Sequence, residues 1–143
     1  MAVVKSVNIS SKKGIRKNAV DVIELVEKLG IKDDAHAGDW HRQISMLGDE
    51  SFNKAKEKIK GLTYGAFAEN INTEGIVLFE LPIGTQLKIG ETLVEVTQIG
   101  KQCHDDGCAI KKATGDCVMP REGIFVVVKK GGFVKAGDII EMV

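Results

Sequence analysis

The segment from Thr85 to Gly100, TQLKIGETLVEVTQIG, gives the clearest indication of the fold class of this protein. Apolar side chains recur at alternate positions along residues 85–89 and 92–99, and Gly90-Glu91 separates the two segments. A period of two is typical of a β-strand with one buried face. Two such segments on either side of a two-residue turn that contains glycine predict a hairpin. Strict alternation puts Val94, Val96 and Gln98 on one face and Leu93, Glu95, Thr97 and Ile99 on the other.

Similar short segments, separated by glycines, extend outward from this hairpin. The 16 glycines and the small aromatic share of 5% favour many short strands joined by tight turns. Residues 48–59 are the clearest helix, because their apolar positions have helical spacing and Asp49 or Ser51 is placed to cap them. Residues 20–26 fit either a strand or a helix. Further strands are predicted at residues 2–10, within the apolar runs 75–84 and 123–128, and at residues 138–143.

The composition predicts one soluble globular domain over residues 1–143. Apolar residues make up 43% and charged residues 28% of the chain, which is ordinary for this class. The 20 basic residues balance the 20 acidic ones, which argues against bulk nucleic-acid binding, because that requires a basic excess. No apolar run approaches the roughly 20 residues that cross a bilayer. The N-terminus has no signal-peptide pattern, so we expect a cytoplasmic location and no membrane partner.

All three cysteines, Cys103, Cys108 and Cys117, fall close together. An odd number cannot pair completely, and in a reducing compartment such thiols are free, metal-bound or catalytic. Lys101 and His104 favour a thiolate at Cys103, whereas Asp105 and Asp106 oppose it. Three interpretations stay open: a reactive thiolate, inert buried cysteines, or a zinc site. The zinc ligands would be Cys103, His104, Cys108 and Cys117, although a Cys-x4-Cys spacing is at the edge of the usual zinc pattern.

Polar side chains gather in four other segments. Residues 11–17 form a basic loop, and residues 33–45 combine His, Asp, Arg, Gln and Ser with the only Trp. Composition alone favours a solvated turn for the first, and it leaves the second open between a ligand-binding loop and a surface loop. A buried Glu69-Asn70 pair must be hydrogen-bonded, which favours bracing of a turn over contact with a ligand. Arg121 suits recognition of a carboxylate or phosphate, or an ion pair with a neighbour such as Glu122.

In their order and spacing, these segments resemble one family, the MOSC domain, named for the C-terminal part of molybdenum-cofactor sulfurases. The resemblance covers nearly the whole chain, and it is the order of the pieces that makes it specific. It implies a mostly β fold, a MOSC-type β-barrel with a few short helices, and therefore a strand for residues 20–26. The family often has Gly-Asp where this chain has Asp33-Asp34. The matching pieces are Ser10 with residues 12–17, and residues 34–38, 42–45, 65–71, 73–76, 81–85, 87–90, 95–104, 115–125 and 137–138.

The resemblance also implies a function. The domain would bind the molybdenum cofactor (molybdopterin), and Cys103 would ligate molybdenum or carry sulfur. The setting would be cofactor sulfuration or biosynthesis, or a molybdenum-dependent reduction. The partner would be a molybdopterin-adenylating protein, a cysteine desulfurase or a redox protein. The alternatives are a non-catalytic carrier of cofactor or molybdate, and the zinc-stabilised binding domain.

The candidate ligand contacts fall into two groups. Cationic side chains would bind the pterin phosphate, and these are Lys12, Lys13, Lys17, Arg42 and Arg121. Hydrogen-bonding side chains would bind the pterin or shape its pocket, and these are His36, Gln43, Ser45, Glu69 and Asn70.

Overall fold

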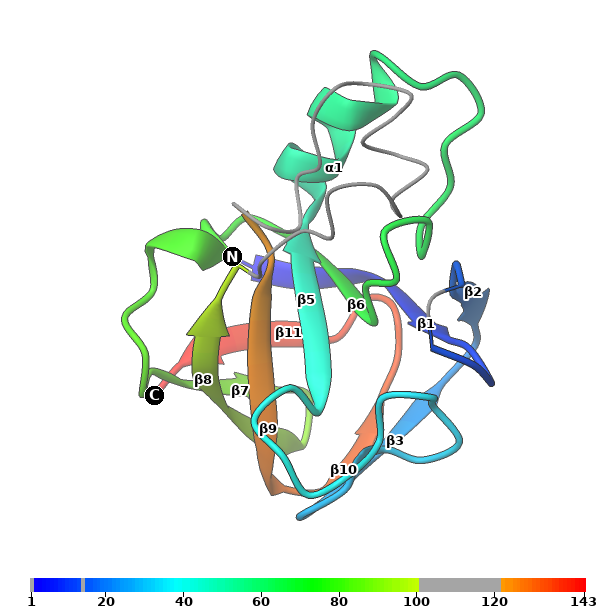
Figure 1. The fold of residues 1–143 in the computed structure, drawn as a ribbon. Helices are drawn as coiled ribbons and strands as arrows, with labels where there is room; N and C mark the ends of the chain where they lie inside the picture. The colour runs from blue at the N-terminus through cyan, green and yellow to red at the C-terminus, as the bar shows by residue number, and fades with distance from the viewer. Residues whose placement is uncertain (1, 14, 101–121) are drawn as a thin grey trace.

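The computed structural model of the protein describes residues 2–13, 15–100 and 122–143. Among these residues, seven strands pair in the ring order β11-β7-β8-β9-β5-β6-β1, and the pairing of β1 with β11 closes it into a barrel (Figure 1). The prediction of a mostly β, barrel-type fold is therefore confirmed. The barrel strands are β1 (Ala2–Ile9), β5 (Ile44–Gly48), β6 (Ile71–Glu74), β7 (Gln86–Ile89), β8 (Thr92–Ile99), β9 (Ile124–Lys130) and β11 (Ile139–Met142).

Smaller elements surround the barrel. β2 (Asn18–Val20) pairs with β1, and β10 (Gly132–Val134), β3 (Ile23–Val26) and β4 (Gly30–Ile31) form a separate small sheet. The strand prediction for residues 20–26 is confirmed, but the chain leaves one sheet and enters the other between Val20 and Ile23. The helix α1 (Asp49–Lys56) stands above one end of the barrel, directly after β5 (Figure 1). None of the described helices is long and apolar enough to cross a bilayer.

The predicted hairpin forms from β7 and β8, with Ile89 opposite Thr92. Val94 and Val96 are fully buried, as alternation predicts. The alternation then breaks, because Val96 lies opposite Val126 while Gln98 lies opposite Phe125. Two residues of β8 therefore oppose one residue of β9, which is a β-bulge. The assignment of Gln98 to the same face as Val94 and Val96 is wrong for this reason.

Two other local predictions are wrong. The N-cap of α1 is Gly48 and makes no side-chain cap bond, because Asp49 and Ser51 already lie inside the helix. Their side chains face other partners, since Tyr64 donates to Asp49 at 2.6 Å and Ser51 donates to Glu122 at 2.6 Å. The apolar run 75–84 forms the short 3-10 helix η1 (Leu78–Glu80) instead of a strand. Its buried residues, Leu78 and Leu81, are three apart, which matches one 3-10 turn.

The core has two parts, and β5 separates them. Ile44 and Met46 point into the apolar interior of the barrel. Leu47 packs on the other side of β5 with Phe125 of β9 and with Phe52 of α1. We call this second side of β5 and β9 the outer face. Because β5 is buried on both sides, its sequence does not show the alternation of a half-exposed strand.

Candidate functional site

Lys17 lies at the centre of a buried cluster beside the end of β1. Its ammonium nitrogen is 2.7 Å from Oδ1 of Asp34, 2.9 Å from Nδ1 of His36 and 3.3 Å from Oγ of Ser10. The side chains of Lys17 and Asp34 are both completely buried. The solvated-turn interpretation of the basic loop is therefore wrong for Lys17, although Lys12 and Lys13 are exposed.

The Lys17 cluster fixes the orientation of His36. An ammonium offers three N–H donors and no acceptor, so Nδ1 of His36 accepts the hydrogen bond from Lys17. Asp34 holds the backbone of the same residue, because its Oδ2 accepts from the His36 N–H at 3.0 Å. Trp40 donates from Nε1 to the His36 carbonyl at 2.8 Å, and the Lys13 ammonium lies 5.0 Å from the Trp40 ring centre. His36 is therefore held in a rigid setting by contacts to its ring, its backbone N–H and its carbonyl.

A second buried cluster, the closed amide cluster, consists of Asn8, Ser45, Glu69, Asn70 and Asn72. Asn70 joins three segments: its Oδ1 accepts from the Ser45 N–H at 3.0 Å and its Nδ2 donates to the Asn8 carbonyl at 3.1 Å. Asn72 donates to Oε2 of Glu69 at 2.7 Å and accepts from Asn8 at 2.8 Å. These bonds link β1, β5 and β6, so the cluster braces the barrel wall.

Glu69 is the ionisable member of the closed amide cluster. Burial raises its pKa above the ordinary value for Glu, and the hydrogen bonds from Asn72 and from backbone N–H groups oppose this shift. One of those donors is the Phe67 N–H, at 3.0 Å from Oε1. Gln43 is buried in a similar way, and its Oε1 accepts from the Val128 N–H of β9 at 2.9 Å. The structure thus gives Gln43, Ser45, Glu69 and Asn70 contacts within the protein.

Arg42 lies over the outer face, half-buried. Its guanidinium carbon is 5.2 Å from the ring centre of Phe125, and its Nε donates to Oε1 of Gln98 at 3.2 Å. The same oxygen is 3.0 Å from Nε2 of His41. Gln98 also donates from its Nε2 to the carbonyl of Gly100 at 2.7 Å. Gln98 thereby connects His41 and Arg42 to Gly100, the last described residue before Lys101.

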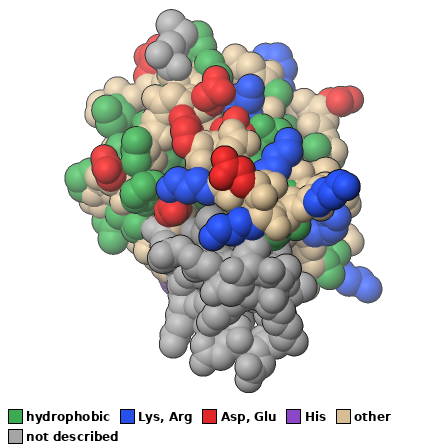
Figure 2. All heavy atoms as spheres, turned by 90° about the horizontal axis from the view of Figure 1, so that it is seen from above, with side chains coloured by type: hydrophobic (Ala, Val, Ile, Leu, Met, Phe, Trp, Pro, Cys, Tyr) green, Lys and Arg blue, Asp and Glu red, His purple; other side chains and the backbone are tan. Residues whose placement is uncertain are grey.

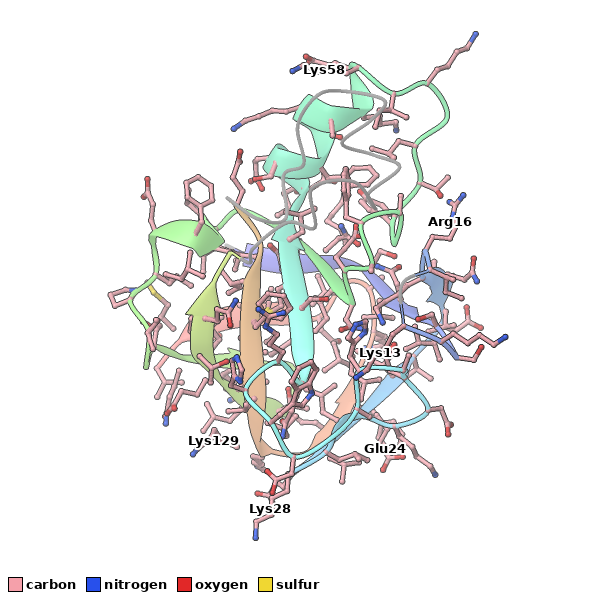
Figure 3. The ribbon with its side chains drawn as sticks, viewed as in Figure 1. Lys13, Arg16, Glu24, Lys28, Lys58 and Lys129 are labelled. Carbon is pink, nitrogen blue, oxygen red and sulfur yellow. The ribbon has the colours of Figure 1, made fainter. Side chains whose placement is uncertain are left out.

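Charges of both signs cover the end of the molecule that carries α1. Figure 2 shows Lys and Arg side chains interspersed with Asp and Glu side chains, so neither sign dominates among the described side chains of this face. Lys58 lies at the α1 end, and Lys28 and Lys129 lie at the opposite end (Figure 3). These surface lysines are spread over the molecule and do not gather into one basic patch, which agrees with the balanced net charge.

Some predicted site residues lie outside the described part of the chain. These are the thiol Cys103, the cation Arg121, and the other proposed zinc ligands His104, Cys108 and Cys117. In the rest of the chain, no group of three or more His, Cys, Asp or Glu side chains is placed to hold a metal ion. The structure does describe the residues on either side of 101–121, and there the Gly100 N–H donates to the Gly123 carbonyl at 2.6 Å.

Three residues of the site were not predicted from the sequence. Asp34 matches the family pattern, but its pairing with Lys17 joins residues seventeen positions apart. Asn72 looks like an ordinary polar strand residue, although it is completely buried. Gln98 was assigned to the wrong face. The sequence does contain a signal for Gln98, because this polar residue stands where the alternation of Val94 and Val96 predicts an apolar one.

The sequence between Asp33 and Glu141 matches a protein-family model described as the MOSC domain. The chain belongs to the MOSC domain family. This family is associated with the molybdenum cofactor. No curated protein matches the chain significantly in sequence.

Solved structures share this MOSC fold. The YuaD protein from Bacillus subtilis superposes with a TM-score of 0.80 at 19% identity, over 99% of this chain and 96% of that chain. YiiM from Geobacillus stearothermophilus superposes with a TM-score of 0.77 at 23% identity, over 100% of this chain and 75% of that chain. YiiM from Escherichia coli gives 0.69 at 21% identity, over 100% and 70%. At these identities the likeness concerns the fold.

Proposed function

We propose that this MOSC domain binds the molybdenum cofactor and that Cys103 is its reactive thiol. The observation that carries the proposal is the arrangement around Arg42. Neither terminal nitrogen of its guanidinium has a hydrogen-bond partner in the part of the chain that the structure describes. Through Gln98, this cation is connected to Gly100, from which the chain continues to Cys103.

The described residues fit such a cofactor in their chemistry. A pterin phosphate needs a cation with free donors, and a guanidinium with two open nitrogens meets that need. Exposed Lys12 and Lys13 add positive charge on the neighbouring loop. His36, held by Lys17, lies in the Lys17 cluster and would hydrogen-bond the pterin or shape its pocket. The cofactor's own chemistry would be atom transfer at molybdenum, with a thiolate as a soft ligand or sulfur carrier.

The site residues then divide into two roles. Lys12, Lys13, Arg42 and Arg121 would contact the phosphate, and His36 would hydrogen-bond the pterin or shape its pocket. Lys17, Gln43, Ser45, Glu69 and Asn70 would hold the loops and strands from which those contacts extend, because each is buried and bonded within the protein. Cys103 would ligate molybdenum or hold a transferable sulfur. The zinc alternative depends on cysteines outside the described residues and has no support in the rest of the chain.

The test is cofactor content after expression in a host that makes the molybdenum cofactor. We expect purified wild-type protein to carry molybdenum by elemental analysis and pterin by fluorescence. Cys103→Ser should lose molybdenum or the transferable sulfur, whereas Cys108→Ser and Cys117→Ser serve as matched controls and should keep both. Wild-type protein free of molybdenum and pterin, or a Cys103→Ser variant equal to wild type in metal content and sulfur transfer, would contradict the proposal.

A second measurement separates a reducing enzyme from a carrier. Cofactor-loaded protein supplied with an electron donor should reduce N-hydroxylated compounds if the domain takes part in molybdenum-dependent reduction. A carrier binds the cofactor and shows no turnover. Stoichiometric zinc without molybdenum would instead favour the zinc-stabilised binding domain.

A further inference from the structure

We infer that Gln98 is a positioning residue that orients Arg42 for an oxyanion and fixes it relative to Gly100. The inference deepens the proposed function, and it rests on that function only for the identity of the natural ligand. Its own basis is the set of contacts that Gln98 makes with His41, Arg42 and Gly100.

The direction of Gln98 comes from the β-bulge in β8. Regular pairing would give Gln98 the same orientation as Val94 and Val96, toward the barrel interior. The extra residue between Val96 and Gln98 shifts the register, and bulges of this kind re-aim side chains near functional sites. The Thr97 hydroxyl holds the bulge, since it lies within hydrogen-bond distance of the His41 and Phe125 carbonyls. The outcome is a Gln98 side chain that faces residues 41–42.

The orientation of the Gln98 amide is determined at both ends. Its oxygen faces the Nε–H donor of Arg42, which cannot accept a hydrogen bond. Its nitrogen faces the carbonyl of Gly100, which cannot donate one. A flipped amide would place donor against donor and acceptor against acceptor, so only one arrangement is satisfied. One neutral side chain therefore fixes a cation on one side and the backbone before Lys101 on the other.

The guanidinium of Arg42 is oriented but keeps its charge. The Phe125 ring supports one face of the plane, and Gln98 uses only the Nε–H. No described carboxylate forms an ion pair with Arg42. A neutral acceptor at position 98 thus leaves a full positive charge and a two-nitrogen fork, the geometry that recognises phosphate-type oxyanions. A glutamate at the same position would neutralise it.

The experiment measures binding of inorganic phosphate to the cofactor-free protein by NMR, following the Arg42 Nε–H signal. We expect Gln98→Met, which removes the hydrogen bonds to Arg42 and Gly100 and the contact with His41, to weaken phosphate binding roughly tenfold, the usual worth of a hydrogen bond to a charged group. Gln98→Glu should weaken it at least as much, because the new carboxylate pairs with Arg42. Gln86→Met is the matched control, since Gln86 lies on the neighbouring strand and contacts Glu95 at 3.4 Å. That variant should bind phosphate like wild type.

A double-mutant cycle distinguishes positioning from general structural support. In an Arg42→Met background, Gln98→Met should cause no further loss of phosphate binding. Additive losses, or a wild-type Arg42 signal that phosphate does not move, would overturn the inference. Failure of the proposed function looks different, because it appears as absence of molybdenum and pterin from wild-type protein while phosphate binding still depends on Gln98.

Discussion

Lys17 and Arg42 are both cations placed next to a histidine, yet the structure treats them in opposite ways. Lys17 is completely buried and pairs with the buried carboxylate of Asp34 at 2.7 Å. Arg42 is half-buried, rests on Phe125 and is held by the neutral amide of Gln98. The first charge is neutralised inside the protein, and the second remains available.

The two settings distinguish a cation that stabilises the fold from a cation that can bind a ligand. A buried ion pair satisfies itself, and its loss leaves an uncompensated charge in a medium that solvates it poorly. A cation that is oriented by a neutral acceptor gains little stability from its surroundings, but it keeps its charge for a ligand. We therefore expect substitutions at Lys17 to affect folding and substitutions at Arg42 to affect binding.

The largest expected effect comes from Lys17→Met. It keeps most of the apolar stem of the side chain but leaves the Asp34 carboxylate buried without its cation, which costs about 3–5 kcal/mol in the free energy of unfolding. Urea unfolding measures this loss. The matched control is Lys5→Met, because Lys5 forms only an exposed pair with Glu74 at 3.8 Å and should change stability by less than about 1 kcal/mol. Equal effects for the two lysines would show that the buried pair of Lys17 and Asp34 stabilises the fold no more than an exposed pair does.

The next largest effect concerns the backbone of Lys17, which approaches Gly65 closely. The Lys17 N–H donates to the Gly65 carbonyl at 2.8 Å, and a Cβ on Gly65 would lie 2.1 Å from the Lys17 carbonyl oxygen. Gly65→Ala should therefore cost about 3 kcal/mol, from steric overlap together with a positive φ of 90°. Gly84→Ala is the control, because φ is also positive there but no atom of the described residues lies within 4 Å of the added Cβ. It should cost only about 1 kcal/mol of backbone strain, and a similar loss at both glycines would show that the close approach does not matter.

The sequence predicts the parts of this fold in which one strand face is apolar. β1, β7 and β8 follow from alternation, and their bounds differ from the predicted ones by a residue at most. β5 and β6 do not follow, because β5 is buried on both faces and β6 buries Asn72 and Thr73 in its interior positions. Such polar residues inside a strand can be explained only when their hydrogen-bond partners, which are distant in sequence, are known.

The contacts of the candidate site, too, could not be predicted where they join segments that are distant in sequence. Residue types in 33–45 predict a polar loop, but the pairing of Lys17 with Asp34 and the β-bulge before Gln98 are tertiary features. One departure from the family does have a local explanation. Asp33 stands where relatives often have glycine, and it adopts a positive φ of 69°. Asp tolerates this region better than most residues, so the loop conformation is compatible with the substitution.

A smaller effect concerns the pH dependence of the closed amide cluster. Burial raises the pKa of Glu69, so its stabilising contribution is complete below the ordinary value of 4.5 and is lost as the pH rises through the folded-state pKa. Gln cannot titrate, so Glu69→Gln should become more favourable relative to wild type as the pH rises from about 4 to about 8. Urea unfolding across this range tests the sign. Glu95→Gln, at a half-exposed position of β8, is the control and should show no such trend. An opposite slope for Glu69→Gln would mean that its hydrogen bonds outweigh its burial.

The smallest expected effect on stability is that of Arg42→Met. The substitution keeps an apolar contact with Phe125 and removes one hydrogen bond to a neutral acceptor that is also within reach of His41, so we expect a loss of about 1 kcal/mol or less. The same variant should lose most of its affinity for inorganic phosphate, because the two open guanidinium nitrogens are gone. Urea unfolding and a phosphate titration on one protein preparation give both numbers. If Arg42→Met destabilised the fold as strongly as Lys17→Met, Arg42 would be a structural cation like Lys17. Its half-exposed guanidinium would then not be the proposed ligand-binding group. A small loss of stability together with a large loss of phosphate binding would place the two cations in different roles.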